Sequence, residues 1–151
     1  SKLLLPSVRI GYMVLPQHLT PLYQARANRY NQTASKVEQL ALADYVQSGQ
    51  LERHLRRLRK VYAQKSSTLM DCLQAAFGGR AELHLQETPL CVTLRFFHSR
   101  SPLRLAELAA AHGVRVRPGP EGNVTLGFAG IPLEEIAPGV DALQAAWAEN
   151  A

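Results

Sequence analysis

The feature that most constrains the fold is a change of hydrophobic period at Gly78-Gly79. Before this pair, from Leu51 to Phe77, apolar residues recur every three or four positions, with one gap at Lys65, which predicts one long amphipathic helix that the glycines end. At about 1.5 Å per residue such a helix is on the order of 40 Å long, enough to join two lobes. After the pair, residues 82–86 and 90–97 alternate in period two, which predicts two neighbouring strands.

The rest of the second half continues as short helices and strands. A helix is predicted from Ser101-Pro102 to about residue 112, short strands at 114–117 and 123–128, and a last helix from Pro132. The order β-β-α-β-β-α predicts a small α+β domain, with a mostly antiparallel sheet and helices on one of its faces.

The first half is predicted to be mostly helical, with one strand. The run VRIGYMVL at residues 8–15 is rich in β-formers and predicts a strand. A weak helical pattern covers about 19–29, and Ser35 with Glu38 forms a capping-box pattern for a helix that ends near Gln47. Because the predicted strand has no obvious partner, we expect the chain to be part of a larger fold. We also expect this strand to pair with a second copy, as a homodimer, or to pack against the long helix.

Composition places the chain among ordinary globular proteins. It is 46% hydrophobic and 19% charged, with a net charge of +5, which favours anionic ligands without establishing nucleic-acid binding. We find no signal peptide and no apolar run that could span a bilayer, so we expect a cytoplasmic protein without a membrane partner. Cys72 and Cys91 are expected to be reduced core thiols, and the Cys and His spacings predict no metal site.

Lys2 and Arg9 are the residues at the start of the chain that could carry chemistry. Lys2 precedes three leucines, and apolar surroundings lower a lysine pKa, which would favour its amine as a Schiff-base nucleophile. Arg9 could hold a phosphate group through two parallel hydrogen bonds. Spacing alone does not separate this interpretation from a surface lysine and an arginine that flank a strand.

The stretch SKLLLPSVRIGYMVLP resembles the lysine segment of fold-type-I enzymes that use pyridoxal 5′-phosphate (PLP). It is most similar to the form found in MocR-type regulators, GntR-family proteins with an aminotransferase-like domain. The resemblance implies that Lys2 holds PLP as an aldimine, that Arg9 binds the cofactor phosphate, and that Ser1 belongs to the cofactor site.

Two further stretches carry the same resemblance, in the same order along the chain. VEQLALADYVQSGQLERHLRRLRKVYAQKSSTL is similar to the family's Glu-Gln, Gly and His-Arg-Arg pattern, and GVRVRPG with VTLGFAGIPLEEIAPGV is similar to its C-terminal end. The resemblance implies the C-terminal part of the fold-type-I aminotransferase fold. Residues 1–50 would end the PLP-binding large domain, 51–77 would form a connecting helix, and 78–151 would form the small domain.

Thr125 departs from the family pattern. Aminotransferases of this fold carry an arginine on the last strand to bind the substrate carboxylate, and the alignment puts Thr125 there, facing away from the predicted core. Threonine cannot form a two-pronged pair with a carboxylate, so we expect Thr125 to contact a substrate or effector in some other way, with Arg115 or Arg117 as possible substitutes. The basic run RHLRRLRK could face nucleic acid, but its amphipathic spacing favours a solvated or packed helix face.

The resemblance therefore implies an effector-sensing domain of a transcriptional regulator. The effector would be a small amine or amino acid, the protein would be a homodimer, and DNA would be bound only by a separate N-terminal winged-helix domain. The alternative is a PLP-dependent aminotransferase acting on amino acids. We expect this chain alone not to hold PLP tightly, because other parts of the cofactor site would come from residues outside it.

Overall fold

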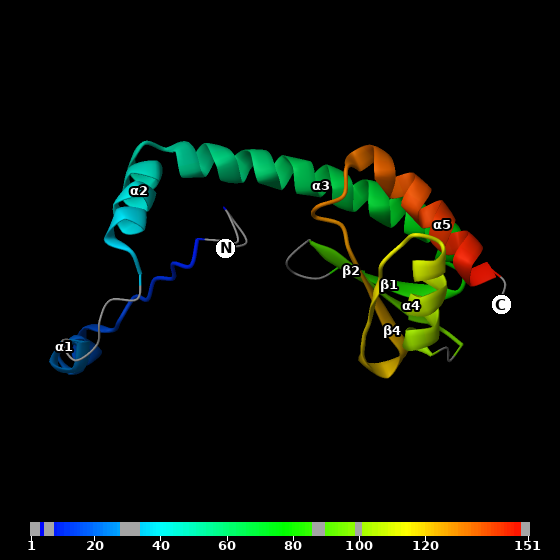
Figure 1. Cartoon of the computed structure of the whole chain (residues 1–151), viewed down its shortest axis with the longest axis horizontal. Helices are drawn as coiled ribbons and strands as arrows, with labels where there is room; N and C mark the ends of the chain where they lie inside the picture. Colours follow the sequence, from blue (N-terminus) through cyan, green and yellow to red (C-terminus); the bar gives the residue numbers. More distant parts are fainter. Residues whose placement is uncertain (1–3, 5–7, 28–33, 86–89, 99–100, 149–151) are drawn as a thin grey trace. The chain divides into compact units, whose positions relative to one another are not determined.

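The computed structural model describes residues 4, 8–27, 34–85, 90–98 and 101–148, which group into two compact units, 1–57 and 58–151 (Figure 1). The boundary between the units lies inside the longest helix. Each unit is described separately below. The domain boundaries expected from the sequence, at 50 and 77, remain a prediction.

The unit 1–57 contains short helices. A 3-10 turn, η1 (Gln17–Leu19), leads into α1 (Thr20–Ala27), and α2 (Lys36–Gln47) follows. Ser35 stands at the N-cap of α2, but its side chain makes no capping hydrogen bond, so the predicted capping box is wrong. Backbone bonding starts this helix instead, with the Gln39 amide donating to the Ser35 carbonyl at 3.0 Å.

The strand predicted at residues 8–15 does not form. The described residues 8–16 have no regular secondary structure, and Tyr12 and Val14 are 94% and 84% exposed. The reason is physical: a strand satisfies its backbone groups by pairing with another strand, and all four strands in the described part of the chain lie in the other unit. A run of β-forming residues favours extended backbone, but it does not supply a partner strand.

The long helix α3 (Gln50–Phe77) ends at Gly78-Gly79, as predicted, and it begins directly after Gly49. Gly49 has a φ of 72°, a left-handed conformation that favours glycine, and this lets α3 begin directly after α2. At the other end the Gly78 amide donates to the Gln74 carbonyl at 3.0 Å. The last three turns of α3 bury Leu69, Leu73 and Phe77 in the core of the unit 58–151.

A four-stranded antiparallel sheet follows α3. Its strands are β1 (Ala81–Leu85), β2 (Cys91–Phe96), β3 (Arg117–Pro118) and β4 (Asn123–Gly127), in the spatial order β1-β2-β4-β3. The strand predicted at 114–117 is wrong except at Arg117, since only Arg117 and Pro118 pair with β4. The chain then turns through η2 (Pro120–Gly122) into β4.

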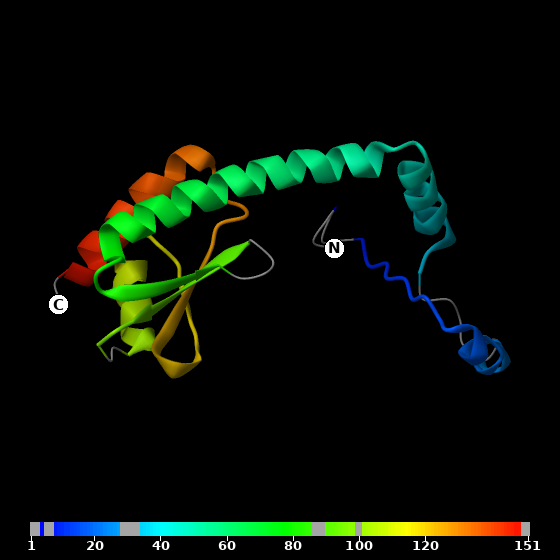
Figure 2. The ribbon, with the colours of Figure 1, turned by 180° about the vertical axis from the view of Figure 1, so that it is seen from behind.

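All the helices of this unit share one core with one face of the sheet. Val92, Leu94 and Val124 are fully buried, whereas the residues between them in the strands are not, so one face packs inward. The helices that contribute are α3, α4 (Pro102–Ala111) and α5 (Ile136–Ala148), the last preceded by η3 (Leu133–Glu135). Figures 1 and 2 both show α5 running alongside the end of α3. The predicted fold class, a small antiparallel sheet with helices on one face, is confirmed.

Trp147 is the aromatic centre of that core. Its indole nitrogen donates to the Leu105 carbonyl at 3.0 Å, which ties α5 to α4. Its ring lies 5.3 Å from that of Phe77 and 5.4 Å from that of Phe96 between centroids, in tilted and edge-on arrangements. Cys72 packs against the same cluster as a partly buried thiol, as its helical spacing predicted.

Candidate functional site

Of the residues expected to hold the cofactor, Ser1 and Lys2 lie outside the described residues. Arg9 is described and exposed. Within the described part of the chain its guanidinium has no ion-pair partner, so it can bind an anionic group. This fits the expected role of Arg9 as a phosphate ligand, which remains a prediction.

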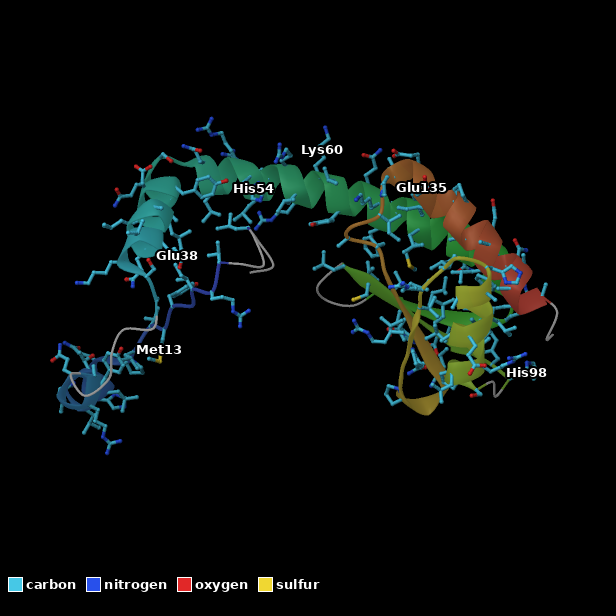
Figure 3. All side chains as sticks on the ribbon, in the orientation of Figure 1. Met13, Glu38, His54, Lys60, His98 and Glu135 are labelled. Atoms are coloured by element: carbon cyan, nitrogen blue, oxygen red, sulfur yellow. The ribbon has the colours of Figure 1, made fainter. Side chains whose placement is uncertain are left out.

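An apolar hollow of about 440 Å³ lies in the unit 1–57. Its lining residues come from the N-terminal segment, α2 and the first turns of α3: Leu4, Val8, Glu38, Ala41, Leu42, Tyr45 and His54. Figure 3 labels Glu38 on α2 and His54 on α3. Sequence reasoning treated His54 only as part of a basic pattern and did not predict this hollow.

The basic run at the start of α3 is mostly exposed. Arg56 pairs with Glu52 at 3.6 Å, one helical turn away on the surface. Arg53 and Arg57 line a smaller polar hollow of about 270 Å³ beside Tyr45. A solvated helix face therefore accounts for these residues.

Thr125 lies on the face of the sheet that is opposite the core. It is partly exposed, between the buried Val124 and Leu126, as alternation predicts. Thr93 stands directly opposite it on β2, and their hydroxyl oxygens are 3.5 Å apart. Arg117 is the partner of Thr125 on the other side, on β3. The expected contact of Thr125 with an effector remains a prediction.

At the other edge of the same face the charges are paired. Arg95 donates to Glu82 at 2.6 Å, and the His84 ring nitrogen lies 3.2 Å from the same carboxylate. The hydrogen bond from Arg95, and then that from His84, lowers the pKa of Glu82 below its ordinary value. Sequence reasoning missed this cluster, although Glu82 and Arg95 on adjacent alternating strands were a usable signal.

The described residues hold no group of three His, Cys, Asp or Glu side chains that could bind a metal ion. None of the described helices is long and apolar enough to cross a membrane.

Comparison with known proteins begins with sequence. No family model matches the chain. It is 34% identical over 155 aligned residues to the uncharacterized HTH-type transcriptional regulator YdeL of Bacillus subtilis, covering 97% of this chain and 34% of that protein. It is 26% identical to the probable rhizopine catabolism regulatory protein MocR of Rhizobium meliloti, covering 97% of the chain and 31% of MocR. The chain spans about a third of the length of these curated relatives.

Among solved structures the chain is similar to LysN, the α-aminoadipate aminotransferase of Thermus thermophilus, crystallised with N-(5′-phosphopyridoxyl)-L-leucine. The TM-score is 0.72 at 22% identity, with 89% of this chain and 36% of LysN covered. This likeness shows that the chain has the fold of part of an aminotransferase. The expected relationship to MocR-type regulators and the expected fold are both confirmed.

Proposed function

We propose that this chain, a relative of part of the MocR-type regulators with the fold of an aminotransferase, is the effector-sensing region of a PLP-dependent transcriptional regulator. One observation carries the proposal: the same 151 residues align over 97% of their length with HTH-type regulators and adopt part of an aminotransferase fold. The longer protein would bind DNA through a separate N-terminal winged-helix domain and would form a homodimer.

In this proposal Lys2 holds PLP and Arg9 binds its phosphate, with Ser1 beside them. PLP supplies an aldehyde that combines reversibly with primary amines, which suits it to detect a small amine or amino acid. The guanidinium of Arg9 offers parallel donors to phosphate oxygens, and its exposure leaves it accessible. Binding of an effector would shift the protein between two conformations that differ in DNA binding.

A threonine at position 125 favours the sensing of an effector over catalytic turnover of a substrate. A threonine hydroxyl offers one donor where an arginine offers a planar pair, so it fixes a substrate carboxylate less firmly. Catalysis depends strongly on such fixation, whereas sensing needs only a difference in affinity between two conformations. The alternative, amino-acid transamination, is decided by assaying the full-length protein for keto-acid formation.

The cofactor assignment is tested by measuring visible absorbance of the full-length protein during titration with PLP. We expect a band of protein-bound PLP that disappears in Lys2→Ala. The matched control is Lys36→Ala, since Lys36 is an exposed lysine at the start of α2. A band that persists in Lys2→Ala, or that is lost equally in Lys36→Ala, would show that Lys2 does not hold the cofactor.

A further inference from the structure

We propose that residues 129–132, which join β4 to η3, form a strap that opens and closes on α3, and that Lys65 is the latch that holds this strap closed. All of these residues lie in the unit 58–151. The inference therefore stands apart from the function proposed above, and its test needs neither PLP nor Lys2.

Lys65 occupies a position on α3 that the helical pattern assigns to an apolar residue. It follows Tyr62 by three positions and precedes the buried Leu69 by four, so it lies in the same stripe, and it is partly buried. An ammonium group that is partly removed from water needs a hydrogen-bond acceptor. The gap that Lys65 makes in the apolar stripe therefore indicates that this lysine has a specific partner.

The partner of Lys65 is a backbone carbonyl far along the chain. The Lys65 ammonium donates to the Ala129 carbonyl at 3.1 Å, across 64 positions of sequence. No carboxylate of the described residues lies within ion-pair distance of Lys65. A hydrogen bond from a charged donor is stronger than one between neutral groups, so this single contact can fix where the carbonyl lies.

The strap runs over the surface between two fixed points. Phe128 before it is 1% exposed and Ile136 after it is 3% exposed, so both belong to the core. Residues 130–132 between them are exposed. In Figures 1 and 2 the orange segment between β4 and α5 passes beside α3. A surface segment with few packed side chains opens at a lower free energy than the core does.

Within the described part of the chain, the bond from Lys65 is the only hydrogen bond that reaches the strap from a distant element. The other bonds are local: the Ile131 amide donates to the Phe128 carbonyl at 3.1 Å, and the Glu135 amide donates to the Pro132 carbonyl at 3.2 Å. Loss of the Lys65 bond would therefore free the strap while the core stays folded. Since the strap continues β4, its opening gives that strand a movable end.

The experiment is amide hydrogen exchange of the 151-residue chain, measured by NMR. In Lys65→Met the Ile131 amide should exchange at least about tenfold faster, the change that corresponds to one charge-assisted hydrogen bond. The amide of Leu143, which is buried in the core, should not exchange faster, because methionine adds an apolar side chain to an apolar stripe. A role of Lys65 in overall stability would instead raise both exchange rates together.

Lys60→Met is the matched control. Lys60, labelled in Figure 3, is an exposed lysine on the same helix and forms no ion pair within the described residues. Its replacement removes the same charge and should change the exchange rate of Ile131 by less than about twofold. Three results would overturn the proposal: unchanged Ile131 exchange in Lys65→Met, equal acceleration at Ile131 and Leu143, or the same acceleration of Ile131 in Lys60→Met.

Discussion

The two units of this chain differ in how they hold their apolar residues. In the unit 58–151, sixteen hydrophobic side chains are buried in one core. In the unit 1–57, none of the described side chains is buried, and Tyr12, Val14, Val37 and Leu40 are more than 70% exposed. Hydrophobic patterning alone does not make a core, because a core requires elements that face one another.

This contrast separates stability from cofactor chemistry. The residues proposed to hold PLP belong to the unit without a core. Exposed apolar surface on this scale is typical of interaction sites, so we expect the rest of the longer protein or a second copy to cover it. Changes to the buried residues of 58–151 should therefore alter folding, whereas a change to the exposed Arg9 should alter PLP affinity with little effect on folding.

The largest effect is expected from Trp147→Ala. Trp147 is 1% exposed, contacts the rings of Phe77 and Phe96, and donates a hydrogen bond to α4. Removing the indole leaves a cavity and an unpaired carbonyl, which should lower the free energy of unfolding by about 3–5 kcal/mol. Urea denaturation followed by circular dichroism measures the change.

Tyr12→Ala is the matched control for this prediction. Tyr12 is 94% exposed, so removing its ring should change the free energy of unfolding of the chain by less than about 0.5 kcal/mol. A comparable loss in both variants would mean that the N-terminal segment is part of the stabilising core, and the contrast between the units would fail.

The same contrast explains what the sequence could predict of the fold. Local periodicity predicts the helices of 58–151, the strands β1, β2 and β4, and the face of the sheet that is buried. Their partners lie nearby in the chain. The strand at 8–15, predicted from its β-forming residues, does not form, because the described residues supply no partner strand for it. The strand at 114–117 was too long by three residues because pairing with β4, a tertiary property, limits β3 to Arg117 and Pro118.

The candidate site was predictable to a smaller extent. Alternation placed Thr125 on the open face, and the structure agrees. Its neighbours Thr93 and Arg117 depend on register, which alternation cannot supply, because a shift of two residues preserves the pattern while changing every cross-strand pair. The hollow in the unit 1–57 was missed, since its lining residues come from three separate segments.

An intermediate effect is expected from Arg9→Ala in the full-length protein. If Arg9 binds the cofactor phosphate, its loss should weaken PLP binding by about 1.5–3 kcal/mol, the range for hydrogen bonds to charged groups. Stability should change little, because Arg9 is exposed and lies outside the core. Titration with PLP, followed by absorbance, gives the affinity.

Arg26→Ala controls for the general effect of removing a positive charge. Arg26 is also exposed, in the last turn of α1. Equal losses of PLP affinity in the two variants would remove Arg9 from the phosphate site and leave only long-range attraction. A loss of PLP affinity in Arg9→Ala alone would support Arg9 as a phosphate ligand that lies outside the folded core.

The smallest effect is expected from Glu82→Gln, and it should depend on pH. Hydrogen bonds from Arg95 and then His84 lower the pKa of Glu82 from its ordinary value of 4.5 in the folded state. A carboxyl group with a lowered folded pKa stabilises the fold above its unfolded pKa, and that contribution is lost as the pH falls through the folded pKa. The stability difference between the unchanged chain and Glu82→Gln should therefore be constant at neutral pH and shrink below about pH 4.5. It should be small throughout, because Glu82 and Arg95 have partly exposed side chains and solvent screens the pair.

Urea midpoints measured at several pH values test this prediction. The control is Asp71→Asn, because Asp71 is exposed on α3 and forms no ion pair within the described residues. A difference that grows on acidification would mean that the ionised carboxylate of Glu82 destabilises the folded sheet, contrary to its pairing with Arg95.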